Sequence, residues 1–281
     1  AFVNIGPEKF VQSLPLTKVY EKETECFFTK KSFQEPDSAT LGVGISFLKN
    51  PRNGQIHKVF AAQELVSLNA FRKYKVNQCP DDMTSFTHWI PAYLNEKHGE
   101  KAMHLLPRCL GIICTGSHRD FNPEMILEVV PRIVGGKVQQ IATGNAYDAV
   151  KALRSYCQYH HLLLVYLQRY PQVRKIMRSM IIKFINDPES RTKEAISSLS
   201  DFMTLFFVVG SEEEEAKESE PISMKALLAA VVEEINVRSV LWIVKKTPEL
   251  EKTTPDEKID QQRIALSFES SKAGFQILLL H

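Results

Sequence analysis

The sequence lacks the features that most quickly assign a protein to a class. Its five cysteines are an odd number and include no Cys-x-x-Cys pair, which argues against a disulfide framework. This usage is typical of reduced thiols inside a cell, so we expect a cytoplasmic protein, with the nucleus as the alternative. The net charge is only +2, so no strong field favours nucleic acid or a membrane surface, and we expect neither as a partner.

Long apolar runs and a leader sequence are also missing. The longest apolar stretches, at 162–167 and 205–210, are far shorter than the roughly 18 residues of a membrane-spanning helix. No basic and then apolar leader opens the chain. The chain begins with AFVNIG, without methionine, and stops within the apolar run FQILLLH. We therefore expect a piece excised from a longer, multidomain protein.

The common catalytic and cofactor motifs are absent as well. The sequence contains no phosphate-binding G-x-x-x-x-G-K-[ST], no dinucleotide-binding G-x-G-x-x-G and no G-x-S-x-G nucleophile elbow. VGGKVQQ at 134–140 has no strand before it and no hydroxyl partner for its lysine, and HGEKAMH at 98–104 lacks the spacing of a zinc protease. We therefore expect no cofactor and no metal.

Most of the chain has helical periodicity. In AAQELVSLNAFRKYKV, residues 61–76, apolar residues recur at steps of three and mark one face of a helix. The same reasoning predicts helices at 61–76, 84–97, 100–115, 123–141, 145–169, 172–186, 189–209, 222–246 and 256–280. Several of these, such as 194–209, are apolar on more than one face and must pack on several sides.

Capping residues agree with these helices. Asn122 is followed by Pro123 and Glu124, which suit the N-cap, the first helical position and the positive first turn. The same cap-proline-acid pattern recurs at 187–189 and 254–256. Three glycines stand where helices should end: Gly116, Gly144 and Gly210. These patterns predict the helix boundaries.

The fold that follows is mainly α, a multilayer helical array with a small N-terminal β-hairpin element. Turn dipeptides Asn50-Pro51 and Asn53-Gly54 place the hairpin at about 41–60. We predict a mixed N-terminal element at 1–60 and a helical domain at 61–281, with an acidic flexible loop at 210–221. Helix pairs with short links suggest packing like that of HEAT or armadillo repeats, although no repeat near the usual period of about 40 residues is evident.

The stretch SYCQYHHLLLVYLQRYP, residues 155–171, holds the strongest candidate site. On a helix Cys157 shares a face with His160 or His161, which suits two zinc ligands or a thiol–imidazole pair. Zinc needs further ligands, however, and no second ligand pair has comparable spacing. The apolar and tyrosine-rich neighbours favour a buried core helix. All three interpretations stay open, with the core helix preferred.

Two other stretches have structural or binding interpretations. Arg174, Lys175 and Arg178 in the basic segment 169–183 suit either an exposed helix face or a small nucleic-acid patch. The aromatic segment FTHWIPAYL, residues 86–94, suits the core, where Trp89 needs a partner for its indole N–H.

Four stretches together carry a family resemblance: LGVGISFLKNPRNGQIHKV at 41–59, FTHWIPAYLNEKHGEKAM at 86–103, NPEMILEVVPRIV at 122–134 and YCQYHHLLLVYLQRYP at 156–171. In this order they resemble a helical region found beside ubiquitin-conjugating core domains in large multidomain eukaryotic proteins. The resemblance implies a ubiquitin-pathway context. A conjugating core would carry His-Pro-Asn shortly before its reactive cysteine, and this chain has no His-Pro-Asn. None of the five cysteines can inherit that role.

The leading hypothesis is therefore a non-catalytic helical scaffold of a larger ubiquitin-pathway protein, which binds a protein partner from the ubiquitin machinery or a neighbouring domain. The alternative is an enzyme with an unfamiliar site built from Cys157 and His160, with His88 or His104 as a further member.

Overall fold

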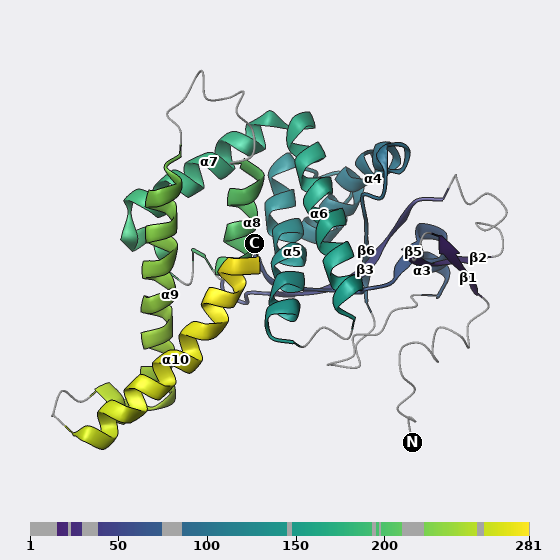
Figure 1. Ribbon diagram of the computed structural model, residues 1–281. Helices are drawn as coiled ribbons and strands as arrows, with labels where there is room; N and C mark the ends of the chain where they lie inside the picture. Colours follow the sequence, from purple (N-terminus) through teal and green to yellow (C-terminus); the bar gives the residue numbers. More distant parts are fainter. Residues whose placement is uncertain are drawn as a thin grey trace. The chain divides into compact units, whose positions relative to one another are not determined.

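The computed structural model describes residues 16–21, 24–29, 39–74, 86–144, 148–192, 195–196, 198–209, 222–251 and 256–280. Within them the chain is mainly helical with a small sheet near the N-terminal end, which confirms the predicted fold class (Figure 1). The chain divides into two compact units. Unit 1 comprises residues 1–137 and 148–173, and unit 2 comprises residues 138–147 and 174–281.

Six strands of unit 1 form one sheet among the described residues: β1 (Leu16–Glu21), β2 (Thr24–Thr29), β3 (Leu41–Lys49), β4 (Ile56–Ala61), β5 (Leu65–Ser67) and β6 (His88–Pro91). The order is β1-β2-β5-β3-β4, and β6 also pairs with β3. Only β2 and β5 are parallel. The sheet therefore continues past residue 60, beyond the predicted N-terminal element.

The predicted hairpin is present as β3 and β4. Its six-residue connection is closed by the Asn50 amide, which donates to the Gln55 carbonyl at 2.8 Å. Gly54 has φ of +70°, a left-handed angle that glycine adopts without strain. The Asn-Gly dipeptide thus supplies the turn, although the loop is longer than a two-residue hairpin turn.

Two predicted helices of unit 1 are wrong. Residues 65–67 of the predicted helix 61–76 form β5, and the helix α3 (Leu68–Tyr74) follows it. The predicted helix at 84–97 is instead β6 and a loop, since Trp89 and Ile90 pair with β3. Both strands are buried on both sides, so their side chains do not show the alternation that identifies a strand.

The remaining helices of unit 1 pack against this sheet. They are α4 (Glu96–Thr115), α5 (Ile126–Ala142), which passes into unit 2 after residue 137, and α6 (Ala149–Arg169). Asn95 caps α4 by accepting from the His98 amide, and Gly116 ends it at φ of +81°. His98 and Gly99 therefore lie in the first turn of α4. The predicted caps at Asn122 and Gly144 are confirmed.

Side chains from distant positions hold unit 1 together. The Trp89 indole N–H donates to the Val66 carbonyl at 3.2 Å, which confirms that Trp89 is a core residue with a partner. Lys137 of α5 is almost fully buried, and its ammonium donates to the Ala61 carbonyl at 2.9 Å at the end of β4. Tyr159 of α6 donates to the Ile90 carbonyl of β6 at 3.3 Å. These bonds join α5 and α6 to the sheet.

Unit 2 contains most of α7 (Pro171–Asn186), and all of α8 (Leu199–Val209), α9 (Met224–Lys246) and α10 (Glu257–Leu280). The predicted continuous helix at 189–209 is wrong. Asp187 does cap a helical segment, in which Pro188 and Glu189 are the first two residues. This segment is the short 3-10 helix Pro188–Arg191, and α8 begins only at Leu199. Gly210, the acidic segment 210–221 and the cap at 254–255 lie outside the described residues.

The core of unit 2 is apolar on several helices. Phe184 of α7 packs on Phe202 of α8 with ring centroids 4.4 Å apart. Eight of the eleven residues of α8 are buried, as predicted for a helix that is apolar all round. HEAT- or armadillo-like stacking of helix pairs stays a prediction. Helices α4, α5 and α6 pack on a sheet, and α9 and α10 form an antiparallel pair.

Candidate functional site

The predicted site residues lie on α6, but on its outer side. Asp148 caps the helix by accepting from the Lys151 amide. The inner side buries large side chains: Tyr159, Leu162, Leu163, Tyr166 and Leu167. Val150 and Leu153 are 65% and 56% exposed, and Cys157 and His161 continue the same stripe at helical spacing and are also exposed. We call these four residues the α6 outer face.

This arrangement corrects part of the sequence interpretation. The helix is a core helix, as predicted from its apolar residues, but Cys157 and His161 are not in the core. His160 is half-buried, and its Nε2 atom has no hydrogen-bond partner. The inner side of α6 carries enough apolar residues to be buried, while the Cys157 thiol and the His161 imidazole face outward.

An aromatic contact holds His161, which lies at the C-terminal end of the α6 outer face. The Tyr93 ring stacks on the His161 ring, with centroids 4.1 Å apart and planes 9° from parallel. Tyr93 also lies against the backbone of α4, because a Cβ on Gly99 would overlap its ring. Gly99 thus makes room for Tyr93 between α4 and α6. This contact between positions 68 residues apart in the chain has no local signal in the sequence.

The thiol and the two imidazoles make separate contacts in the structure. Among the described contacts, no hydrogen bond joins Cys157 to His160 or His161. Instead the His160 ring stacks on Tyr156 with centroids 5.7 Å apart. Burial lowers the pKa of His160, and the charge of His161 lowers it further, so His160 is a weaker base than an ordinary exposed histidine.

The other proposed histidines have separate surroundings. His88 on β6 lies 2.8 Å from the Thr87 hydroxyl through its Nδ1 atom and packs on Phe47, and His104 is exposed on α4. Burial lowers the pKa of His88, with a smaller effect from the charge of Lys49. No described contact links either residue to Cys157. The described contacts therefore do not bring His88 or His104 into a site with Cys157.

The sequence interpretation missed the most perturbed histidine, His98. Its Nε2 atom accepts the amide N–H of Leu41, the first residue of β3, at 2.8 Å. Burial lowers the pKa of His98 to about 4, and the charge of Lys101 also lowers it. His98 is therefore neutral at pH 7 and acts as a structural acceptor. An Asn95 N-cap three residues earlier is the local signal that could have placed it in a helix.

We expect acid to destabilise unit 1 through His98. Its pKa is about 4 in the folded state and about 6.5 when unfolded, so the unfolded state binds more protons between these values. The stability is fully present above pH 6.5 and is lost as the pH falls toward 4. The free energy of unfolding should fall by up to about 3 kcal/mol, measured by urea denaturation with Trp89 fluorescence.

His98→Gln is the control for this titration, since a glutamine oxygen can still accept the Leu41 N–H but does not titrate. The variant should lose this part of the pH dependence while its carboxylates still titrate normally. Equal slopes of stability against pH in both proteins would contradict the role of His98.

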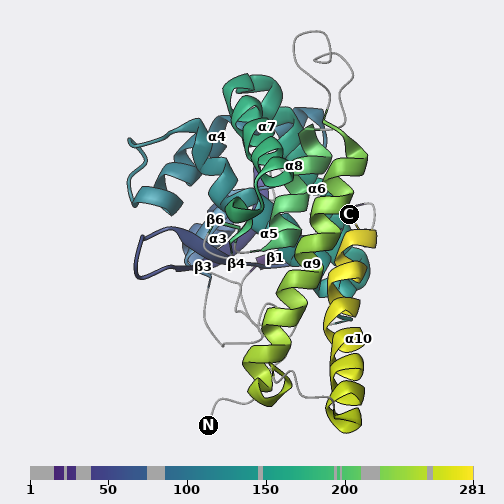
Figure 2. The ribbon, with the colours of Figure 1, turned by 90° about the vertical axis from the view of Figure 1, so that its left-hand side faces the viewer.

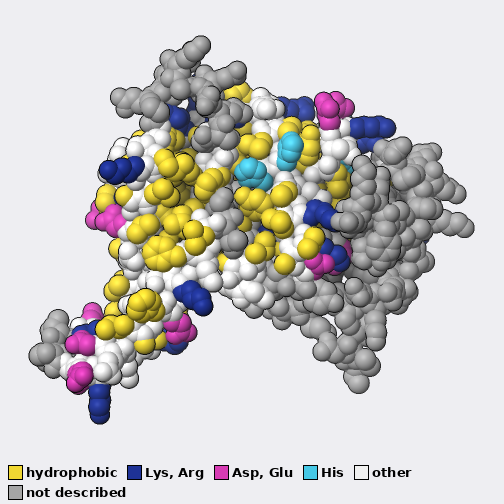
Figure 3. Space-filling view, viewed as in Figure 1, with side chains coloured by type: hydrophobic (Ala, Val, Ile, Leu, Met, Phe, Trp, Pro, Cys, Tyr) yellow, Lys and Arg dark blue, Asp and Glu magenta, His cyan; other side chains and the backbone are white. Residues whose placement is uncertain are grey.

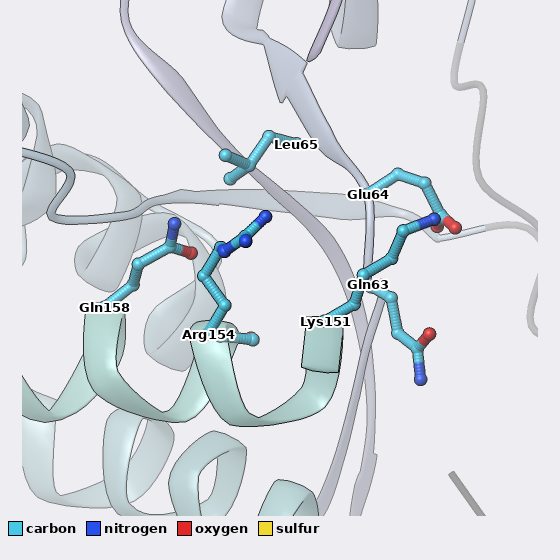
Figure 4. A pocket seen from close by; sticks show the side chains of 7 residues that line it. Gln63, Glu64, Leu65, Lys151, Arg154 and Gln158 are labelled. Atoms are coloured by element: carbon cyan, nitrogen blue, oxygen red, sulfur yellow. The ribbon is translucent and has the colours of Figure 1, made fainter. Parts of the chain in front are cut away.

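A small polar pocket lies beside the α6 outer face. Lys151, Arg154 and Gln158 project from successive turns of α6 toward Glu64 and Leu65 (Figure 4). Ser155 also lines the pocket, is 2% exposed, and its hydroxyl has no hydrogen-bond partner. The cavity measures about 20 Å³, which is the room that one water molecule needs. The pocket is therefore too small for a substrate.

Metal binding finds no support in the described residues. No group of three or more His, Cys, Asp or Glu side chains converges there. Cys109 and Cys114 lie half-buried on α4, and burial raises the pKa of each thiol to about 12. In the basic segment 169–183, Arg174 is 3% exposed and Lys175 is exposed, so the predicted cations do not share one surface.

The chain matches no model of a known protein family, no curated protein and no solved structure. None of the described helices is long and apolar enough to span a membrane.

Proposed function

We propose that this chain is a non-catalytic, mainly helical interaction module of a larger ubiquitin-pathway protein, and that it binds a protein partner through the α6 outer face. The observation that carries the proposal is the exposure of Val150 and Leu153, on the same helical stripe as His161, which stacks on Tyr93. Exposed apolar and aromatic side chains on a rigid element are typical of protein interfaces.

The rigidity of this face supports a docking role. Helix α6 is held to the sheet by the bond from Tyr159 to Ile90, and at its other end Tyr166 donates to the Pro123 carbonyl at 2.9 Å. A surface held from behind in this way loses little conformational freedom when a partner binds. Lys151 and Arg154 adjoin this face, and Lys151 forms an ion pair with Asp148 at 3.9 Å, so the rim carries charges of both signs, as is typical of the polar border of an interface.

The ubiquitin context rests on the resemblance of four stretches to a region beside conjugating cores. Two of them, 86–103 and 156–171, contain Tyr93, Cys157 and His161, so the resemblance covers one end of the proposed surface but not Val150 or Leu153. The partner in this proposal is a conjugating core, ubiquitin itself or a neighbouring domain, in the cytoplasm or nucleus. The chemistry of conjugation would belong to that partner.

Binding measurements test this proposal. We expect purified ubiquitin or a ubiquitin-conjugating core domain to bind the chain, as measured by calorimetry, and Leu153→Glu to weaken the affinity at least tenfold because it places a charge in the apolar centre. Ile112→Glu on α4 is the matched control, since Ile112 is 37% exposed and lies outside the α6 outer face. Equal affinities for both variants would contradict the site, and no binding of either probe would contradict the ubiquitin context.

The alternative is an enzyme in which Cys157 is the nucleophile. The observation in its favour is the exposed thiol one helical turn from His161. If the thiol is not activated, iodoacetamide should modify Cys157 at neutral pH at the rate of an ordinary exposed cysteine, and at least tenfold faster than Cys109 or Cys114, whose pKa values are raised by burial. Peptide mass spectrometry measures each rate.

His160→Ala and His161→Ala distinguish the two functions. We expect less than a twofold change in the alkylation rate of Cys157 in either variant, since no hydrogen bond to the thiol is lost. A tenfold loss in one of them would show that the imidazole activates the thiol, and would favour the enzyme over the interaction module.

A further inference from the structure

We draw no further inference here: the strongest candidate, the set of exposed apolar side chains on the α9–α10 hairpin of unit 2 (Figures 2 and 3), carries none, because Val237 and Leu241 of α9 do not share a face with Ile264 and Phe268 of α10 and nothing in the structure shows what covers them.

Discussion

Replacing Gly42 with alanine is expected to disrupt the centre of the sheet. Gly42 on β3 pairs with Pro91 of β6 and with Val66 of β5. A Cβ at this position would overlap the Ile90 carbonyl oxygen and lie 2.7 Å from Cζ2 of the buried Trp89 ring. The obstacle is mainly backbone in a paired strand, which cannot move aside as a flexible side chain can. We expect the free energy of unfolding to fall by about 3 kcal/mol or more.

Urea denaturation monitored by Trp89 fluorescence measures this loss in unit 1. The protein has two tryptophans, so Trp242→Phe leaves Trp89 as the single reporter. Gly136→Ala on α5 is the matched control, because a Cβ there meets nothing within 4 Å. That change should raise stability by up to about 1 kcal/mol through helix propensity. Similar effects of the two substitutions would contradict the close approach of β3 and β6.

Replacing Arg191 with alanine is expected to have a comparable effect in unit 2. Arg191 is 5% exposed and follows α7. Its Nε atom donates to the Phe184 carbonyl at 2.7 Å and its Nη2 atom to the Ile185 carbonyl at 3.1 Å, which satisfies the end of α7. Its Nη1 atom also donates to Glu233 of α9 at 2.7 Å. Alanine leaves these acceptors unpaired and opens a cavity, at a cost of about 3 kcal/mol.

Two variants separate the causes of this loss. Arg191→Lys keeps the charge but cannot make three bonds in one plane, so it should recover less than half of the lost stability. Glu233→Gln should cost less than about 1 kcal/mol, because Glu233 is 62% exposed and the ion pair is screened by water. Trp242 fluorescence in a Trp89→Phe background reports unit 2. If Glu233→Gln lowered the free energy of unfolding as much as Arg191→Ala, the ion pair would matter more than the bonds from Arg191 to the carbonyls of α7.

The sequence predicted helices well where a cap and an apolar stripe agree. Asn122 before α5 and Gly116 after α4 are examples, because both depend on local backbone geometry. It failed at Leu65 and Trp89, where short strands are buried on both sides. An apolar run of that kind has the same composition as a helix segment, and only pairing with β2 or β3 decides between them.

The candidate site shows a similar limit. Helical spacing correctly placed Cys157, His160 and His161 on one helix, but it could not say which side faces the core. Apolar residues follow directly after His161, so the burial of the inner side was predictable and the exposure of Cys157 was not. The Tyr93–His161 stack depends on Gly99 of a different helix, and therefore on how α4 and α6 pack.

By itself, the sequence determined a mainly helical chain with an N-terminal β-hairpin, because periodicity, caps and turn dipeptides act over a few residues. Only the tertiary structure decided that β5 and β6 join the sheet, that His98 accepts from Leu41, and that apolar stripes on α6 and on the α9–α10 hairpin stay uncovered. Each of these depends on contacts between residues distant in the chain. The free energy of such contacts depends on which surfaces meet, which local patterns do not specify.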